Sequence, residues 1–215
     1  MTEISQTMAS DRDRLVLAML PHVPFDGWSD AAVQAAAGSI GLDAGNARVL
    51  LPDASAAIRH FVKLADRMMV DEVTAAITPA MKVREKIALA VRLRLQRWTP
   101  YREAVRRAVP RTLLRDPARV GSQLYGTVDA IWRAIGDRSV DFNFYTKRAL
   151  LGGVYASTFL YWLDDRSEGC AETWAFLDRR IADVLRVPKA QQAIRDRLSR
   201  LPDPFALIRR FRRAS

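Results

Sequence analysis

The chain has 215 residues, of which 49% are apolar, which is enough for one domain with a sizeable core. Its 34 basic and 24 acidic residues leave a net charge of +10, which favours an anionic partner such as nucleic acid, a lipid surface or an acidic protein. The single cysteine, Cys170, excludes an intrachain disulfide and indicates a reducing compartment. The polar, acidic start has neither a secretory nor an arginine-rich targeting pattern, so we expect a cytoplasmic protein or one that lacks its targeting segment.

Helix start and stop signals recur along the chain, and strand-like alternation bounded by hairpin signals does not occur, so the sequence predicts an all-α fold. Ser10 opens the first predicted helix, and Pro21 ends it. Ser29, Asp43 and Asp53 are each placed to cap a further helix, because their side-chain oxygens can accept an unpaired backbone N–H of the first turn.

Two cap residues followed by proline predict further helix starts. The Thr78-Pro79 pair predicts a helix over about 79–98, and the Asp116-Pro117 pair predicts one over about 117–135. Between these two, we expect a short helix over 101–109 that ends at the following proline.

A near-continuous apolar segment, about as long as a membrane span, extends over residues 141–165. Lys147 and Arg148 lie two turns into it, where a membrane span would be penalised, so we expect a helix of a soluble protein. Such a helix is buried on most sides, in a bundle core, beside an apolar pocket or against its own symmetry mate. Helical spacing separates a small flank, Ala149, Gly152, Gly153 and Ala156, from a bulky flank, Phe144, Leu151, Tyr155, Phe159 and Trp162.

Residues 10–52 have the helix lengths and turns of a helix-turn-helix unit, and a long fourth helix and a larger helical body follow, as in a TetR-like architecture. A DNA-binding unit of this kind must place cations on phosphates. Between Gly27 and Ile58, however, three aspartates stand against one cation, Arg48. We therefore expect no nucleic-acid partner, and a ligand-responsive TetR-type regulator is the alternative function.

The positive charge gathers in two segments. Between Lys82 and Arg119, twelve basic residues stand against three acidic ones, which favours an anionic partner beside the apolar stripe of the helix. The last segment, 202–215, predicts a basic amphipathic helix that docks on an anionic bilayer or on its own domain. Its candidate membrane-binding residues are Phe205, Leu207, Ile208, Arg209, Arg210, Phe211, Arg212 and Arg213.

Residues that carry chemistry are scarce. Two histidines, one cysteine and six glutamates without a Glu-x-x-His motif encode neither a zinc site nor a di-iron site. His60 is expected to be structural, and Asp164, Asp165 and Glu168 are expected to lie in a solvated turn. We therefore predict no catalytic residue, no metal and no cofactor, so that the protein is not an enzyme.

Two motifs carry a resemblance to a known family. The pattern D-F-N-aromatic-Y-T-[KR]-R over 141–148 precedes the apolar helix, and E-T-W-x-F-L follows at 172–177. With this order of elements the chain resembles the "Coq nine" family of ubiquinone-biosynthesis accessory proteins over nearly its whole length. The resemblance implies a TetR-like fold without DNA binding, a homodimer, an apolar pocket for isoprenoids and other lipids, and membrane docking by a C-terminal amphipathic helix. It also implies support of the di-iron hydroxylase that acts on demethoxyubiquinone.

Carried over by position, the family's hydroxylase-binding patch falls on Asp141, Asn143, Phe144, Tyr145, Lys147 and Arg148. Phe144 stands where the family usually has tryptophan, which keeps the aromatic anchor but removes the indole N–H. The residues expected to line the lipid chamber are Leu124, Val128, Trp132, Leu151, Val154, Tyr155, Phe159 and Trp162.

The first hypothesis is thus a dimeric lipid-binding accessory protein that presents a polyprenylated quinone intermediate to a membrane-associated hydroxylase. An isoprenoid quinone or a phospholipid would be its bound lipid. It would comprise a helix-turn-helix-like part at 1–58, a lipid-binding and dimerisation body at 59–201 and the basic helix at 202–215. It would lie on the inner membrane of a bacterium, or on the matrix side in a mitochondrion. A structural partner protein with a solidly packed interior is the third hypothesis.

Overall fold

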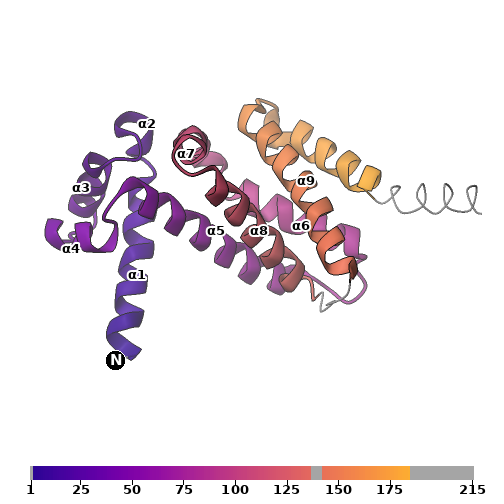
Figure 1. Ribbon diagram of the computed structural model, residues 1–215, viewed down its shortest axis with the longest axis horizontal. Helices are drawn as coiled ribbons and strands as arrows, with labels where there is room; N and C mark the ends of the chain where they lie inside the picture. Colours follow the sequence, from indigo (N-terminus) through magenta and orange to yellow (C-terminus); the bar gives the residue numbers. More distant parts are fainter. Residues whose placement is uncertain (1, 137–141, 185–215) are drawn as a thin grey trace, which may run out of the picture.

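The computed structural model describes residues 2–136 and 142–184, which are helical apart from short connections, so the all-α prediction is confirmed (Figure 1). A further helical segment spans 171–184, and 3₁₀ turns cover Thr99–Tyr101 and Glu168–Cys170. The α-helices are α1 (Thr2–Met19), α2 (Val23–Asp26), α3 (Asp30–Ser39), α4 (Ala44–Leu50), α5 (Ala54–Ala76), α6 (Val83–Gln96), α7 (Arg102–Arg115), α8 (Pro117–Ala134) and α9 (Phe142–Asp164).

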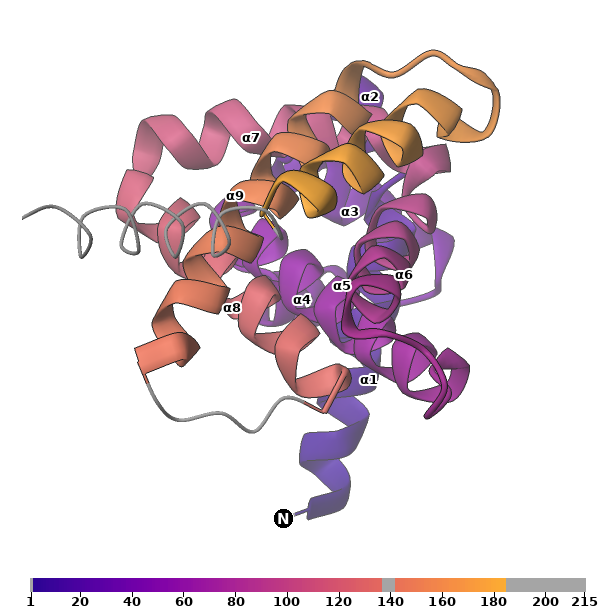
Figure 2. The same cartoon turned by 90° about the vertical axis from the view of Figure 1, so that its right-hand side faces the viewer.

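The helices form an N-terminal unit and a larger body, and α5 connects the two. Figure 1 shows α1–α4 gathered at one end, with α5 extending from them into the body. There α5 packs on α6 and α8, and α8 packs on α9. Figure 2 shows α9 and the 171–184 helix side by side.

An aromatic cluster joins the unit to the body. The Phe61 ring of α5 lies 5.8 Å from the ring of Trp28 and 4.7 Å from the ring of Trp98, measured between centroids. The buried indole N–H of Trp28 donates to the carbonyl of Ala104 at 2.9 Å, so it ties the start of α3 to α7. Burial of such large rings supplies much of the stability of a core.

Four predicted helix caps are confirmed. Ser29, Asp43, Asp53 and Asp116 each accept, through a side-chain oxygen, the backbone N–H three residues further on, at 2.7–3.3 Å. The helices α3, α4, α5 and α8 therefore begin where the sequence predicts, because a cap is a local interaction that needs no distant residue.

Three predicted boundaries are wrong. The first helix begins at Thr2 instead of Ser10, since its polar start continues the helix. The Thr78-Pro79 pair lies in a turn, and α6 begins at Val83, where the carboxylate of Glu85 accepts the N–H of Lys82 at 3.0 Å. Glu85 thus pairs the backbone N–H of Lys82, just before the first turn, and the helix begins four residues after the predicted start.

The third wrong boundary is the helix over 101–109, because α7 continues through Pro110 to Arg115. Proline removes one hydrogen bond within the helix, but Pro110 lies on the exposed side. The opposite side of α7 buries Ala104, Val105 and Ala108, and this packing holds the helix together across the proline.

The apolar helix over 141–165 is confirmed as α9, but a single chain covers only part of its surface. Ala149 and Gly153 are exposed, and Leu160 is 56% exposed. Apart from the adjacent residues and the backbone of α9 itself, a Cβ atom added to Gly152 or Gly153 would meet no described atom within 4 Å. The expectation that this helix is buried on most sides holds for most of its described positions, whereas the small flank is open at Ala149 and Gly153, buried at Gly152 and half-buried at Ala156.

Candidate ligand-binding cavity

A largely apolar cavity of about 310 Å³ lies inside the body, among α5–α9. Its volume is at the lower end of the range of small-molecule pockets, about 300–1,000 Å³. The apolar lining residues are Ile58, Phe61, Val62, Val105, Ala108, Val109, Leu113, Val120, Leu124, Ala156, Phe159 and Leu160. The polar ones are Arg94, Thr112, Gln123, Thr127 and Tyr155.

Helical spacing brings these residues to one place. On α5, Ile58, Phe61 and Val62 are three and four positions apart, so they share the face that meets α8. Small side chains at Ala108 of α7 and Ala156 of α9 leave room between the converging helices. The interior is therefore not filled solid, which removes the main support for the hypothesis of a purely structural protein.

A buried ion pair forms part of the cavity wall. Arg94 of α6 is 7% exposed, and its Nε donates to the carboxylate of Asp66 of α5 at 2.9 Å. The hydroxyl of Thr127 of α8 donates to the same carboxylate at 3.1 Å. Burial opposes the charge of Arg94, but Tyr155 and Asp66 raise its pKa above the ordinary value, so the guanidinium stays charged and paired.

The hydroxyl of Tyr155 is the polar group most available to a guest molecule. Tyr155 is 7% exposed, lines the cavity and forms no hydrogen bond with any described residue. Burial raises its pKa above the usual value for tyrosine, so the hydroxyl keeps its proton at neutral pH. It can therefore donate to a carbonyl or hydroxyl oxygen of a bound molecule.

Exposed leucines mark the mouth of the cavity. Leu113 of α7 is 46% exposed and Leu160 of α9 is 56% exposed, and both line the cavity. The neighbouring Leu114 is 86% exposed. Apolar side chains grouped on a surface indicate a binding surface for an apolar partner.

The structure brings three of the eight predicted lipid-binding residues to the cavity: Leu124, Tyr155 and Phe159. It places the other five, Val128, Trp132, Leu151, Val154 and Trp162, in the packed core, where each is at most 6% exposed. A helical pattern marks apolar faces but does not separate a cavity wall from a solid core. The contributions of α5 and α7 were missed, because no local pattern shows that these distant helices meet α9.

The predicted partner-binding patch is only partly described. Asp141 lies outside the described residues, as do the side chains of residues 142–145, which include Asn143, Phe144 and Tyr145. Arg148 is 5% exposed, and its Nε and Nη2 donate to the carboxylate of Asp129 on α8 at 3.0 and 2.8 Å. Its charge thus holds α9 to α8 within the chain.

Lys147, the remaining member of the patch, lies beside a core tryptophan. Its Nζ is 5.6 Å from the ring centroid of Trp132, a distance typical of a cation–π contact. All eight candidate membrane-binding residues in 202–215 lie outside the described residues. Among the helices that the structure describes, none is both long and apolar enough to cross a membrane.

Metal-ligating side chains do not gather in the described part of the chain, where no group of three or more His, Cys, Asp or Glu residues could hold an ion. His60 lies in a structural contact, as expected, with its Nε2 2.6 Å from a carboxylate oxygen of Asp13 on α1. Burial lowers the pKa of His60 although Asp13 opposes this effect.

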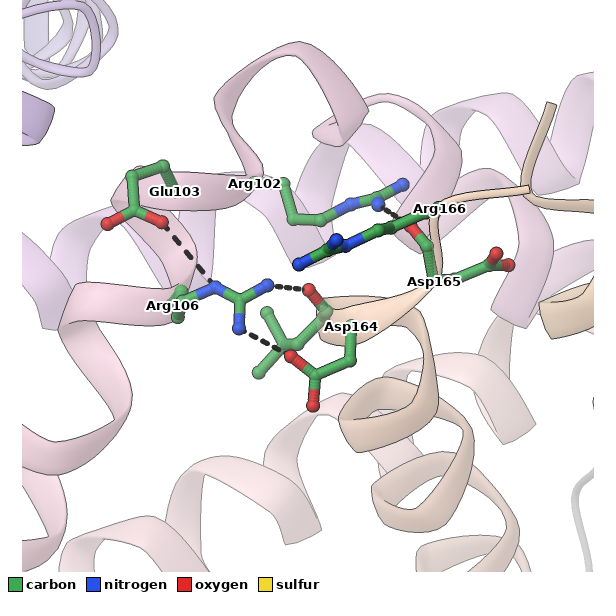
Figure 3. A pocket seen from close by; sticks show the side chains of 7 residues that line it. Arg102, Glu103, Arg106, Asp164, Asp165 and Arg166 are labelled. Atoms are coloured by element: carbon green, nitrogen blue, oxygen red, sulfur yellow. Dashed lines mark hydrogen bonds and ion pairs between the residues drawn. The ribbon is translucent and has the colours of Figure 1, made fainter. Parts of the chain in front are cut away.

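A second, charged cavity of about 530 Å³ lies where α7 meets the end of α9 (Figure 3). Figure 3 shows Arg102 and Arg106 of α7 pointing at the C-terminal end of α9. Arg106 donates to the carbonyl of Leu163, and Arg102 donates to that of Asp165. These bonds satisfy carbonyls that a helix end leaves unpaired, so this cavity is a structural joint.

The expected solvated turn at the end of α9 is wrong for Asp165, which is 4% exposed. Its carboxylate accepts bonds from the N–H and hydroxyl groups of Ser167 and Thr173, at 2.5–2.9 Å. Burial alone would raise the pKa of Asp165, but these bonds lower it to about 2. Asp164 and Glu168 are exposed, as expected.

The outer face of α4, the helix that would contact DNA, has few cations that could bind a phosphate backbone. Asn46 and Arg48 are exposed there, beside Val49, which is 67% exposed. Arg48 is the single cation of this fully described helix.

The fold places the chain in the TetR-like class. A crystal structure of a TetR transcriptional regulator from Nitrosomonas europaea ATCC 19718 superposes with a TM-score of 0.67, covering 82% of this chain and 98% of that one. The two sequences are 19% identical, so the likeness shows the fold. The predicted TetR-like architecture is therefore confirmed.

The resemblance to the COQ9 family is confirmed as well. Residues 118–188 match the COQ9 family model. The "Ubiquinone biosynthesis protein COQ9, mitochondrial" of Rattus norvegicus is 34% identical over 184 residues, which are 81% of this chain and 58% of that protein. The Homo sapiens protein of the same name is 33% identical over 184 residues, 81% of this chain and 57% of its own length. The chain thus spans less than two thirds of these relatives.

Proposed function

We propose that the protein is a lipid-binding accessory protein of ubiquinone biosynthesis. One observation carries the proposal: an apolar cavity, opened by exposed leucines, contains a protonated Tyr155 hydroxyl without a hydrogen-bond partner among the described residues. Such a site suits the oxygen-bearing ring of a polyprenylated quinone intermediate. The names of the COQ9 relatives support the pathway.

The physical task is to shield an isoprenoid tail, whose transfer into water costs about 0.8 kcal/mol per CH₂ group. A cavity of roughly 150 Å³ is enough for benzene. The 310 Å³ available here hold a ring and the first part of a tail. The rest of a long tail would pass over Leu113 and Leu160 toward the membrane.

The protein would work at the membrane surface without a catalytic residue of its own. The basic helix at 202–215 would hold it on an anionic leaflet, each cation contributing on the order of 1 kcal/mol, so that binding is reversible. The 141–148 patch would meet the hydroxylase, which carries out the chemistry. Two copies would pair through the small flank of α9, where a single chain leaves Ala149 and Gly153 exposed.

Lipid extraction from matched variants tests the cavity. The Ala156→Phe substitution places a ring on the cavity wall, whereas Ala171→Phe puts the same ring on an exposed position outside both the cavity and the small flank. Organic extracts of the purified parent and of Ala171→Phe should contain a prenyl lipid or other apolar ligand, detected by mass spectrometry. The extract of Ala156→Phe should not. A parent without any apolar ligand would refute the proposal.

The alternative function, a ligand-responsive transcription regulator, is favoured only by the fold shared with the Nitrosomonas regulator. The face of α4 with Arg48 as its one cation argues against it. A gel-shift assay against the neighbouring promoter at two salt concentrations decides between the two. Tight, sequence-selective binding would establish the regulator.

A further inference from the structure

A basic cleft of about 210 Å³ opens between α5, α7 and α8. Arg59 of α5, Arg111 and Arg115 of α7 and Arg119 of α8 line it, together with one acidic residue, Asp116. Arg111 and Arg115 are one helical turn apart, so they present their side chains on the same side of α7. Four guanidinium groups thus face a single carboxylate.

The carboxylate of Asp116 already pairs with one of these four arginines, Arg119. Asp116 accepts Arg119 Nε at 2.6 Å, and it also caps α8 through the backbone N–H of Arg119 at 3.1 Å. Arg59, Arg111 and Arg115 form neither an ion pair nor a hydrogen bond with any side chain or carbonyl that the structure describes. The cleft therefore retains three cations for an anion from outside.

Two donors in the wall lie buried without a partner. The N–H groups of Arg111 Nε and Gln123 Nε2 are buried and donate to no acceptor among the described residues. Several other buried side-chain donors of the described residues also lack a partner, so these two make the cleft wall more polar without marking a ligand by themselves.

The cleft and the apolar cavity share part of their walls. Ile58, Thr112 and Gln123 line both of them. A single amphipathic molecule can therefore place an anionic group among the arginines and its apolar chain in the cavity. Arginine suits phosphate in particular, because its planar fork donates two parallel bonds to phosphate oxygens.

We propose that this cleft binds the phosphate group of a lipid whose chain enters the apolar cavity. The proposal deepens the lipid-binding function above and rests on it. It assigns Arg59, Arg111 and Arg115 as the residues that recognise the head group. Because both guests would occupy the same cavity of about 310 Å³, a phosphate-bearing lipid and a neutral quinone would compete for it.

Calorimetric titration of the full chain tests this with three probes: dihexanoyl phosphatidic acid, the uncharged dihexanoyl glycerol and inorganic phosphate. The Arg111→Gln/Arg115→Gln variant removes two of the free cations. The control, Arg107→Gln, removes an exposed arginine of the same helix that pairs with Glu103 outside the cleft. We expect phosphatidic acid to bind the double variant at least tenfold more weakly than the parent and the control, and dihexanoyl glycerol to bind all three alike.

The other outcomes separate the two proposals. Equal affinity of the parent for phosphatidic acid and dihexanoyl glycerol, or equal affinity of the parent and the double variant for phosphatidic acid, would overturn the head-group site and leave lipid binding intact. Inorganic phosphate that binds as tightly as phosphatidic acid would identify a free-phosphate site instead.

Failure of both lipids to bind the parent would refute the lipid-binding function itself. If circular dichroism shows that the double variant is unfolded, the exposed Arg115→Gln alone gives the same comparison.

Discussion

At the scale of single residues, Asp165 has the clearest energetic role, because one buried carboxylate organises the turn after α9. The Asp165→Asn substitution leaves an N–H group facing other donors, so we expect a loss of about 1–3 kcal/mol in the free energy of unfolding at neutral pH. Urea denaturation followed by circular dichroism measures it. The same change at exposed Asp178 is the control and should have little effect.

The pH dependence has a definite sign. Since the pKa of Asp165 is lowered to about 2, its stabilising effect is fully present above the usual carboxyl pKa, about 4, and disappears as pH falls toward 2. The difference between parent and Asp165→Asn should therefore shrink across this range. A difference that stays constant down to pH 2 would contradict the ionised carboxylate.

Tyr155 provides a residue-scale test of the cavity. Tyr155→Phe keeps the ring and removes the hydroxyl, so affinity for a short-tailed ubiquinone should fall by the value of one hydrogen bond, roughly 3- to 10-fold. Affinity for a prenyl hydrocarbon without oxygen should not change. Fluorescence titration of both ligands measures the contrast, and equal losses for the two would show a packing effect instead.

At this scale, the helix caps were predictable from the sequence, but the residues that line the cavity were not. Ser29 and Asp116 cap the predicted helices because the donor they serve is three residues away. Phe159 and Trp162 carry the same apolar signal on α9, yet Phe159 borders the cavity and Trp162 is in the solid core. That distinction depends on side chains of the other helices around α9, which the pattern of α9 alone does not show.

At the scale of elements, α7 carries an interior proline that should reduce its stability. Proline inside a helix is about 3 kcal/mol less favourable than alanine, part of which is offset by the stiffer unfolded chain. We expect Pro110→Ala to raise the free energy of unfolding by about 1–2 kcal/mol. Thermal and urea denaturation measure this change.

Pro117 is the matched control, because it occupies the first turn of α8, where proline is favoured. Pro117→Ala should leave stability unchanged or lower it slightly. A Pro110→Ala protein less stable than the parent would show that a bend at this position is required for the packing of α7.

The same two prolines explain where element boundaries could be predicted. At Asp116-Pro117 the cap and the proline agree, and the helix begins there. At Pro110 the local rule predicts an end, but the buried face of α7 outweighs one lost hydrogen bond. Burial of that face involves α2 and α9, which are distant in the sequence, as well as the adjacent α8.

At the scale of the whole molecule, the net charge of +10 predicts how the protein meets a membrane. We expect it to float with vesicles that contain anionic lipid and to remain free with neutral vesicles. Binding seen in about 0.1 M salt should be largely lost near 1 M, where the screening length falls from about 10 to about 3 Å. Binding that is independent of both lipid charge and salt would contradict electrostatic docking.

The overall class was accessible from the sequence, since the order of caps and helix lengths predicts a TetR-like arrangement that the structure confirms. The cavity could not be predicted from the sequence, because its wall comes from five helices, α5–α9, whose lining residues are up to about a hundred positions apart. The periodicity along one helix does not show which other helices pack against it.

The small volume of the cavity has a consequence for transport. A guest whose tail is longer than the 310 Å³ chamber stays partly embedded in the bilayer from which it is drawn. The protein would then lift the reactive ring toward an enzyme without carrying the molecule through water. Transfer between two vesicle populations should thus be rapid for analogues with one or two isoprene units and negligible for long-chain quinones.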